Sequence, residues 1–244
     1  MTVRLTRFLA RAGASSRRGA ADLIAADRVR INGKPPLGPG DPVDPATDVV
    51  TLDGRTLTMT AGEWLALHKP TGYITSRAPG ERHPTVFTLL KDALPALVAV
   101  GRLDVMSEGL LLFTTDGELA SRLMHPKYEV PRCYRVMVTG SLDADGRRSL
   151  DQGIVIEGEE RPARPARWSF TPAKNGGALD LDLTEGRSRI VRRICTQLGL
   201  GVRTLTRMAY GPVALDGLAP GLSRHLEPAE RDALYRAVQL DPNS

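Results

Sequence analysis

The sequence predicts an α+β protein with a small N-terminal part, residues 1–60, and a larger part, residues 61–244. Two observations favour this class: short stretches with the alternating polarity of strands occur in runs, and amphipathic helical stretches are interspersed among them. In addition, no Gly-rich phosphate-binding loop of the kind found in doubly wound α/β folds is present. We therefore expect a mixed, mainly antiparallel central sheet in the larger part.

The small part begins with two short helical patterns. Apolar residues share one face of the first pattern within residues 5–9 and of the second within residues 20–24. One of two adjacent serines, at positions 15 and 16, can cap the second helix. Residues 29–31 then alternate as a strand before an Asn-Gly turn, and residues 49–57 predict a hairpin. The small part is expected to end near residues 58–62.

The larger part contains alternating segments of 3 to 6 residues and four helical segments. The expected strands are residues 64–68, 97–100, 110–115, 134–138, 154–156, 167–170 and 179–183. The expected helices are residues 85–93, 118–124, 190–198 and a last one after Pro228.

Positive charge is concentrated in two places. Residues 1–34 hold eight Lys or Arg against two Asp, whereas the whole chain carries a net charge of only +5. A second cluster, with no acidic residue between its ends, consists of Arg187, Arg189, Arg192, Arg193, Arg203 and Arg207. Dense basic patches on a balanced background suggest a polyanionic partner such as nucleic acid, and the alternative is a solvated basic face kept for solubility.

Several classes of protein are excluded or disfavoured by composition. No apolar stretch approaches the length of a membrane span. Cys133 and Cys195 lie far apart and make no disulfide framework, and the four histidines show no metal-ligand spacing. The Arg- and Ser-rich start can mimic an organelle transit peptide, but the same residues fit a folded helical motif. We therefore expect a cytoplasmic protein with no metal and no membrane partner.

Three segments carry residues suited to chemistry: 101–104 (Gly-Arg-Leu-Asp), 131–134 (Pro-Arg-Cys-Tyr) and the Arg-rich 185–193. Taken singly, each has a structural explanation: Asp104 can end a turn, Tyr134 can be a core aromatic residue, and the arginines can form the solvated face of a helix. Taken together, an Asp nucleophile, an aromatic platform and an Arg that orients the carboxylate would suit a nucleobase flipped out of an RNA.

Residues 101–111 resemble the Gly-Arg-Leu-Asp-x-x-(Thr/Ser)-x-Gly-Leu-Leu signature of pseudouridine synthases of the RsuA/RluB type. The resemblance continues through residues 112–126 and includes the motifs at 68–72, 84–87 and 185–193. Residues 1–57 resemble the S4-type RNA-binding domain, through Arg-Leu-x-x-Phe-Leu-Ala-Arg-Ala-Gly, then Ser-Arg-Arg, then Arg-Val-x-Ile-Asn-Gly. Residues 113–120 and 123–126 look closer to the RluB branch, which acts on large-subunit ribosomal RNA.

This resemblance implies a small S4-type domain, residues 1–60, and a pseudouridine synthase catalytic domain, residues 61–244. It implies that the chain isomerises a specific uridine of ribosomal RNA, with 23S RNA as the expected substrate, without a metal or an organic cofactor, and we expect it to act as a monomer. Asp104 would be the nucleophile, Tyr134 would stack on the flipped uracil, Arg192 would pair with the carboxylate and Arg102 would contact a phosphate. The residues expected to dock RNA are Arg4, Arg7, Arg17, Arg18, Arg30 and Lys34.

Other functions remain open from the sequence. The chain could be a small-subunit (16S) RNA pseudouridine synthase, or a ribosome-assembly protein that kept the fold and lost catalysis. A glycosidase with paired carboxylates is a third alternative, but only Asp104 has a motif around it. Two departures from the family pattern concern the site itself: Arg132 replaces the usual Lys, and Ile190 stands where Gln is usual.

Overall fold

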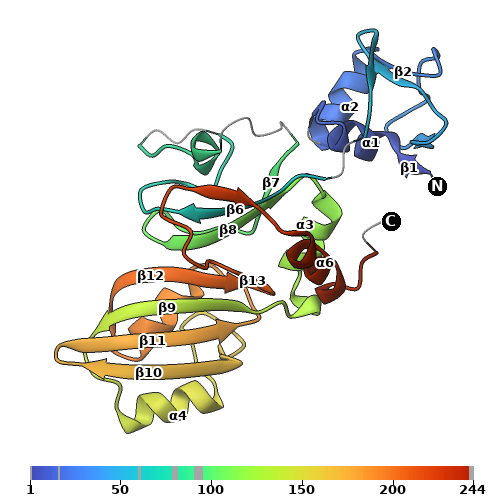
Figure 1. Ribbon diagram of the computed structural model, residues 1–244. Helices are drawn as coiled ribbons and strands as arrows, with labels where there is room; N and C mark the ends of the chain where they lie inside the picture. The colour runs from blue at the N-terminus through green and yellow to red at the C-terminus, as the bar shows by residue number, and fades with distance from the viewer. Residues whose placement is uncertain (1, 16, 60–61, 79–81, 91–95, 242–244) are drawn as a thin grey trace. The chain divides into compact units, whose positions relative to one another are not determined.

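The computed structural model describes residues 2–15, 17–59, 62–78, 82–90 and 96–241 (Figure 1). The chain divides into two compact units. Unit 1 comprises Met1–Trp64, Lys91–Val98 and Phe113–Gly117, and unit 2 comprises Leu65–Leu90, Ala99–Leu112 and Glu118–Ser244.

Unit 1 contains the two predicted helices, the predicted strand and the predicted hairpin. Its elements are β1 (Val3–Arg4), α1 (Leu5–Arg11), α2 (Arg17–Ala25), β2 (Val29–Ile31), β3 (Pro42–Val43), β4 (Val50–Leu52) and β5 (Arg55–Leu57). Strands β2, β4 and β5 form an antiparallel sheet, and β1 pairs with β3. Leu5 and Phe8 of α1 pack with Ala20 of α2 and Val29 of β2, so the apolar face of each helix closes one small core.

Unit 2 is built on a mixed, mainly antiparallel sheet, as the sequence predicts. The strand order is β10-β11-β9-β12-β8-β6-β14, and β13 pairs with β12 while β7 pairs with β8. The strands are β6 (Trp64–Lys69), β7 (Val98–Val100), β8 (Glu108–Thr114), β9 (Arg132–Thr139), β10 (Arg167–Ala173), β11 (Gly176–Leu183), β12 (Gly201–Tyr210), β13 (Val213–Ala214) and β14 (Ser223–His225). The parallel pairing of β12 with β8 joins the two halves of the sheet.

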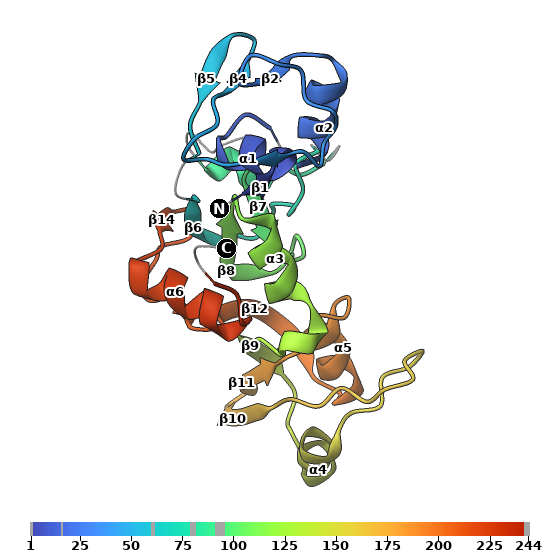
Figure 2. The same cartoon turned by 90° about the vertical axis from the view of Figure 1, so that its right-hand side faces the viewer.

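Helices cover this sheet and complete its core. They are the 3-10 turns η1 (Val86–Leu89) and η2 (Pro126–Tyr128) and the helices α3 (Gly117–Met124), α4 (Ala144–Gln152), α5 (Ile190–Gln197) and α6 (Pro228–Ala237). Leu150 of α4 and Ile194 of α5 are fully buried in one cluster with Val136 of β9 and Leu181 of β11, so both helices cover the same face of the sheet. Helices α3 and α6 lie side by side in Figures 1 and 2. Arg122 of α3 donates to the carbonyl oxygen of Gln239, just after α6, at 3.1 Å. Within the described residues, no helix combines the length and apolarity needed to cross a lipid bilayer.

The structure differs from the sequence prediction at two of the expected elements. Residues 154–156 do not form a strand of the sheet: Ile154 makes an isolated bridge to Ala163, and the apolar alternation arises because Ile154 and Ile156 both enter the core. The expected helix at residues 85–93 is a single 3-10 turn over Val86–Leu89, and its end, residues 91–93, lies outside the described residues.

The sequence prediction missed helix α4 and strand β12, as well as the short strands β1, β3, β13 and β14 and the 3-10 turn η2. Helix α4 buries only Leu150, so it shows no apolar stripe, although Asp143 caps it by accepting a hydrogen bond from the Gly146 N–H at 2.7 Å. Strand β12 is interrupted by two register shifts against β9 and buries an arginine, Arg207, so its polarity does not alternate as an ordinary strand requires.

Candidate active site

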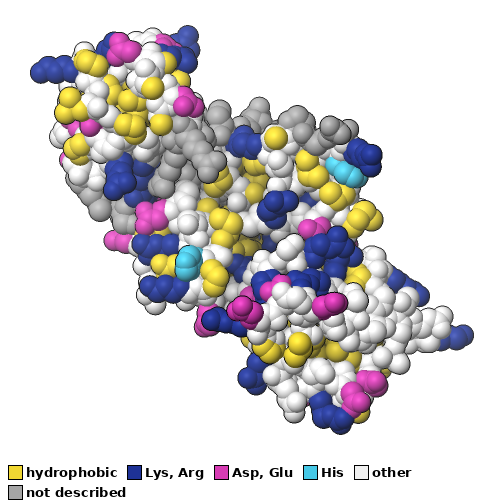
Figure 3. Space-filling view, turned by 180° about the vertical axis from the view of Figure 1, so that it is seen from behind, with side chains coloured by type: hydrophobic (Ala, Val, Ile, Leu, Met, Phe, Trp, Pro, Cys, Tyr) yellow, Lys and Arg dark blue, Asp and Glu magenta, His cyan; other side chains and the backbone are white. Residues whose placement is uncertain are grey.

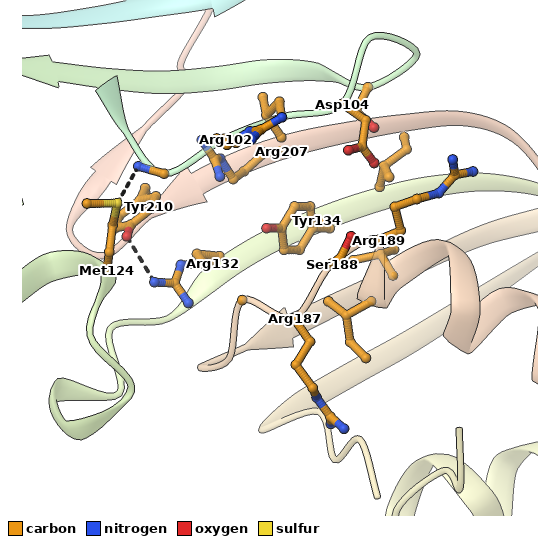
Figure 4. A pocket seen from close by; sticks show the side chains of 17 residues that line it. Arg102, Asp104, Met124, Arg132, Tyr134, Arg187, Ser188, Arg189, Arg207 and Tyr210 are labelled. Carbon is orange, nitrogen blue, oxygen red and sulfur yellow. Dashed lines mark hydrogen bonds between the residues drawn. The ribbon is translucent and has the colours of Figure 1, made fainter. Parts of the chain in front are cut away.

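A pocket of about 470 Å³ opens on unit 2, a volume in the range typical of small-molecule sites. Its walls come from the turn at residues 101–107, from β9, from residues 186–191 before and within α5, and from β12, with Met124 at one end. Figure 4 shows Asp104, Tyr134 and Arg207 around this hollow. The three sequence segments singled out for chemistry therefore meet in one place.

Asp104 is exposed to solvent, but its backbone is tightly held. It begins a turn in which the Ser107 N–H donates to the Asp104 carbonyl oxygen at 3.0 Å. The Gly72 N–H donates to the carbonyl oxygen of Val105 at 2.8 Å, and the Thr75 hydroxyl donates to that of Leu103 at 3.0 Å. Asp104 can therefore be both a turn residue and a site residue, because the turn presents an open carboxylate from a fixed backbone.

Lys69, at the end of β6, holds this turn from inside the protein. Its side chain is fully buried, and Nζ donates to the carbonyl oxygens of Ser107 at 2.7 Å, Pro70 at 3.0 Å and Asp104 at 3.1 Å. Burial lowers the pKa of the Lys69 ammonium to about 8, although the nearby Asp104 and Glu108 carboxylates oppose that shift. The sequence places Lys69 in a motif but shows nothing of its contact with residues 35 to 38 positions further on.

Arg192 holds the same turn from the side of α5. Its Nη2 donates to the Met106 carbonyl oxygen at 2.7 Å and lies 3.4 Å from the Ser107 hydroxyl oxygen. Among the described residues, no ion pair joins Arg192 to the Asp104 carboxylate, and Arg192 is not part of the pocket wall. The structure therefore brings Arg192 to the backbone of the Asp104 turn, and its pairing with the carboxylate stays a prediction.

Replacing Lys69 with Met is expected to lower the free energy of unfolding by about 1–3 kcal/mol, because carbonyl oxygens beneath the turn lose their donor. It should also lower turnover more than RNA affinity, since the Asp104 turn loosens. Urea unfolding and single-turnover kinetics measure the two effects. An unchanged turnover at reduced stability would mean that the turn keeps its geometry without Lys69.

The pH dependence of turnover and of the free energy of unfolding of the wild-type protein should reflect the titration of Lys69. As pH rises through about 8, Lys69 loses its proton and a donor, so turnover should decline between pH 7 and 9. The pKa of Lys69 is lower in the folded than in the unfolded chain. The unfolded state therefore binds more protons above pH 8, and the Lys69 contribution to the free energy of unfolding rises in this range. Lys69→Met should lose both trends, which paired pH series of activity and urea unfolding would reveal.

Tyr134 and Arg102, two further predicted site residues, both line the pocket. Tyr134 is half-buried on β9, with part of its ring packed against the core cluster of the sheet. It is therefore both a pocket wall and a partial core residue. Arg102 is exposed, at the mouth of the pocket, where its guanidinium can reach a phosphate outside the wall.

The two departures from the family pattern have clear positions in the structure. Arg132 is buried and donates to the Tyr210 hydroxyl at 3.0 Å and to the carbonyl oxygens of Leu123 at 3.1 Å and Thr184 at 3.3 Å. Arg132 therefore lines the pocket and also ties β9 to α3, to the residue after β11 and to β12. Ile190 is buried at the start of α5 and faces both the core cluster and the pocket.

Most of the second basic cluster is used inside unit 2, contrary to its reading as an open patch. Arg187 and Arg193 both pair with Glu159, and Arg187 also donates to the carbonyl oxygen of Arg161 at 2.7 Å. These contacts tie the loop before β10 to the segment that leads into α5. On the face shown in Figure 3, basic and acidic side chains lie next to one another in several places, as such pairing requires. Of the cluster, Arg189 and Arg203 are the exposed members.

The residues predicted to dock RNA are in different situations in unit 1. Arg4 on β1 and Lys34 after β2 are exposed. Arg30 donates to both carboxylate oxygens of Asp27, and Arg7 lies 3.8 Å from Asp116. Arg17 and Arg18 begin α2, but their side chains lie outside the described part of the structure.

Within the described residues, no three His, Cys, Asp or Glu side chains gather closely enough to hold a metal ion. Both cysteines are free thiols, and burial raises the pKa of each to about 12. The chemistry that the pocket can perform itself rests on one exposed carboxylate, an aromatic ring and several guanidinium groups.

Comparison with known proteins identifies two family models in this chain. A model described as RNA pseudouridylate synthase matches residues 63–197, which includes the Asp104 turn, Tyr134 and Arg192. A model of the S4 domain matches residues 3–50. The two matches follow one another along the chain in the order that the sequence motifs predict.

Relatives match over nearly the full chain. An uncharacterized RNA pseudouridine synthase from Aquifex aeolicus (strain VF5) is 38% identical over 242 residues, which are 98% of this chain and 96% of the relative. The ribosomal large subunit pseudouridine synthase B of Salmonella typhimurium (strain LT2) is 39% identical over 256 residues, covering 100% of this chain and 86% of that protein. A crystal structure of a pseudouridylate synthase, 28% identical, matches 95% of this chain and 99% of its own with a TM-score of 0.65.

Proposed function

The chain belongs to the RNA pseudouridylate synthase family, and we propose that it isomerises one uridine of large-subunit ribosomal RNA to pseudouridine with Asp104 as the nucleophile. The proposal for the large subunit rests on relatives such as the Salmonella enzyme, whose name states that substrate. We further propose that residues 1–60 act as the RNA-docking domain and residues 61–244 as the catalytic domain, a boundary compatible with the two family matches.

One observation supports the assignment of Asp104 above all others: its carboxylate is open to the pocket while its backbone is held by Lys69 and Arg192 from two sides. A nucleophile must reach its substrate in a defined geometry, because small misplacements of reacting groups cost orders of magnitude in rate. An exposed carboxylate on a loose loop would lack this property.

The other predicted site residues, two in the pocket wall and Arg192 beside the Asp104 turn, have roles that follow from their positions. The flipped uracil would stack on Tyr134, since an aromatic face accepts any base without hydrogen bonds. Arg102 at the mouth would contact a phosphate of the strand, and Arg192 would pair with Asp104 when the substrate draws the two together. Net isomerisation breaks the bond from ribose C1′ to N1 and makes the bond from C1′ to C5, while the C5 proton is replaced by one on N1. Asp104 would start this exchange at the ribose.

Unit 1 would dock the RNA through its exposed basic residues. Replacing Arg4 and Lys34 together with Gln should weaken RNA binding and reduce the slope of log K against log salt by about 0.9 for each lost phosphate contact. The residue to compare is Lys174, which is exposed in unit 2 between β10 and β11; Lys174→Gln should leave the slope unchanged. Fluorescence anisotropy with a ribosomal RNA fragment over a salt series measures this. Equal slopes for the double variant and Lys174→Gln would remove Arg4 and Lys34 from the docking surface.

Mapping pseudouridines in ribosomal RNA from cells with and without this gene tests the proposed function directly. We expect one large-subunit site to disappear without the gene and to return with the wild-type gene but not with Asp104→Asn. A missing site in small-subunit RNA would identify that RNA as the substrate instead. An unchanged map, together with a defect in ribosome assembly, would favour an RNA-binding protein without catalytic activity.

A further inference from the structure

Arg207, on β12, is the most deeply buried charged side chain in the pocket wall, with 2% of its surface exposed. Its position is fixed from several directions. Nε donates to the Leu110 carbonyl oxygen at 2.7 Å, and the guanidinium carbon lies 5.2 Å from the centre of the Tyr210 ring. A guanidinium held in this way cannot swing out to solvent, so its orientation is set before any substrate arrives.

One donor of this guanidinium has no partner in the protein. Nη2 of Arg207 is buried without a hydrogen bond, and within the described residues no carboxylate forms an ion pair with it. Arg132, the other buried arginine of the pocket, differs because it donates to Leu123, Thr184 and Tyr210. A buried, unpaired donor on a charged group is costly, so its presence in a pocket wall requires an explanation, and a ligand that accepts from it is one.

The neighbour of Arg207 in the sheet is Tyr134. The two residues are directly paired between β12 and β9, so their side chains lie on the same face of the sheet about 5 Å apart at Cβ. If the flipped uracil stacks on Tyr134, as proposed above, Arg207 lies at the edge of that base. The phosphates must stay connected to the RNA outside the pocket, where the exposed Arg102 and Arg189 are available to them.

We propose that Arg207 is a catalytic residue that donates from Nη2 to a carbonyl oxygen of the uracil and stabilises the negative charge of the departing base. This inference rests on the proposed function. When the bond from C1′ to N1 breaks, its electron pair leaves with the base, and the charge spreads over N1 and the two carbonyl oxygens. The charge disappears again when C5 attacks C1′ and the C5 proton is replaced by one on N1. A fixed guanidinium buried in the pocket wall favours the charged intermediate over the neutral uridine, which is the condition for catalysis.

The test compares uridine with 5-fluorouridine, whose base leaves more easily because fluorine withdraws electrons. The substrates are transcripts of large-subunit ribosomal RNA made with either nucleotide. Nucleoside mass spectrometry gives single-turnover rates as loss of the parent nucleoside, because C5 of 5-fluorouridine carries fluorine in place of the proton whose loss completes pseudouridine. Arg207→Gln can still donate to Leu110 but lacks the charge, and we expect it to slow the uridine reaction by ~10²–10³-fold. The loss of rate that Arg207→Gln shows with 5-fluorouridine should be at least ~10-fold smaller than its loss with uridine. RNA affinity and its salt slope should not change.

Arg132→Gln is the matched control, since it also removes a buried charge from the pocket wall. We expect it to slow both substrates by the same factor, because Arg132 acts only through the wall. Arg207→Lys keeps the charge, and its rate with uridine should lie between those of wild type and Arg207→Gln. If circular dichroism shows that Arg207→Gln does not fold, Arg207→Lys replaces it in the comparison.

Three results would overturn the inference: equal losses on both substrates for the Arg207 variants, the same substrate-dependent loss for Arg132→Gln, or a reduced salt slope, which would mean a phosphate contact. An inactive wild-type protein would instead contradict the proposed function. An active wild type with an equally active Arg207→Gln would contradict only the role of Arg207.

Discussion

Asp104→Asn is expected to lower pseudouridine formation on the order of 10⁴-fold or more, because an amide can neither attack the ribose nor take a proton from it. RNA affinity should stay within about twofold, since the side chain keeps its size and the turn is held through backbone atoms that the substitution leaves in place. Nucleoside mass spectrometry after single turnover and fluorescence anisotropy measure the two quantities.

Glu108 provides the control for this variant. It is the next carboxylate along the chain, and its Oε1 accepts a hydrogen bond from the Thr206 hydroxyl at 2.9 Å, which Glu108→Gln can preserve. We expect Glu108→Gln to retain turnover within about tenfold of wild type. A loss as large as that of Asp104→Asn would indicate a pair of carboxylates acting together, as in glycoside hydrolysis. Asp104→Asn with near-normal turnover would remove Asp104 as the nucleophile.

Gly109→Ala is expected to lower the free energy of unfolding by about 3 kcal/mol or more, the largest structural effect we expect of any single methyl group near the site. A Cβ at Gly109 would lie 2.4 Å from the Arg207 carbonyl oxygen and 2.5 Å from its nitrogen, and φ at this residue is +105°. Strands β8 and β12 pair in parallel at this point, so the backbone of β12 would have to move away. That movement would displace Arg207, and turnover should fall with stability.

Gly221→Ala separates backbone strain from this close approach. Gly221 also has a positive φ, +82°, but a Cβ there meets nothing within 4 Å. We expect it to cost only about 1 kcal/mol, the strain of the left-handed conformation. Urea unfolding of both variants measures the difference. Equal losses would show that β12 adapts to a side chain at position 109, and that the glycine in this motif serves only its backbone angle.

Local sequence patterns were sufficient to predict a helix or strand where the apolar residues of a segment keep one period along its whole length. The helices of unit 1, the hairpin of β4 and β5 and strands β9 and β11 were predicted because their apolar residues repeat with a helical or strand period. Strand β12 was missed because two register shifts and a buried arginine break that period. Its position in the middle of the sheet is decided by pairing with β9 and β8, and neither partner is adjacent to it in the sequence.

The charged residues also show what a local pattern predicts and what only folding determines. The sequence places six arginines between residues 187 and 207 and predicts an open basic patch. In the folded chain Arg187 and Arg193 find Glu159, which lies 28 and 34 positions earlier, and Arg192 binds the backbone of the Asp104 turn. Opposite charges that are distant in the sequence meet only when the chain has folded, so a local count of charge overestimates what remains for RNA.

The α+β class, the order of an RNA-binding and a catalytic part, and the family were all predictable from the amino-acid sequence, because they depend on periodicity and on short motifs within one segment. The sequence also identified Asp104, Tyr134 and Arg102 as candidates, and the structure places all three at one pocket. The burial of Lys69 beneath the Asp104 turn and the unpaired buried donor of Arg207 beside Tyr134 are visible only in the folded chain. Burial and unmet hydrogen bonds are properties of the packed chain, because they are set by contacts between residues far apart in the sequence.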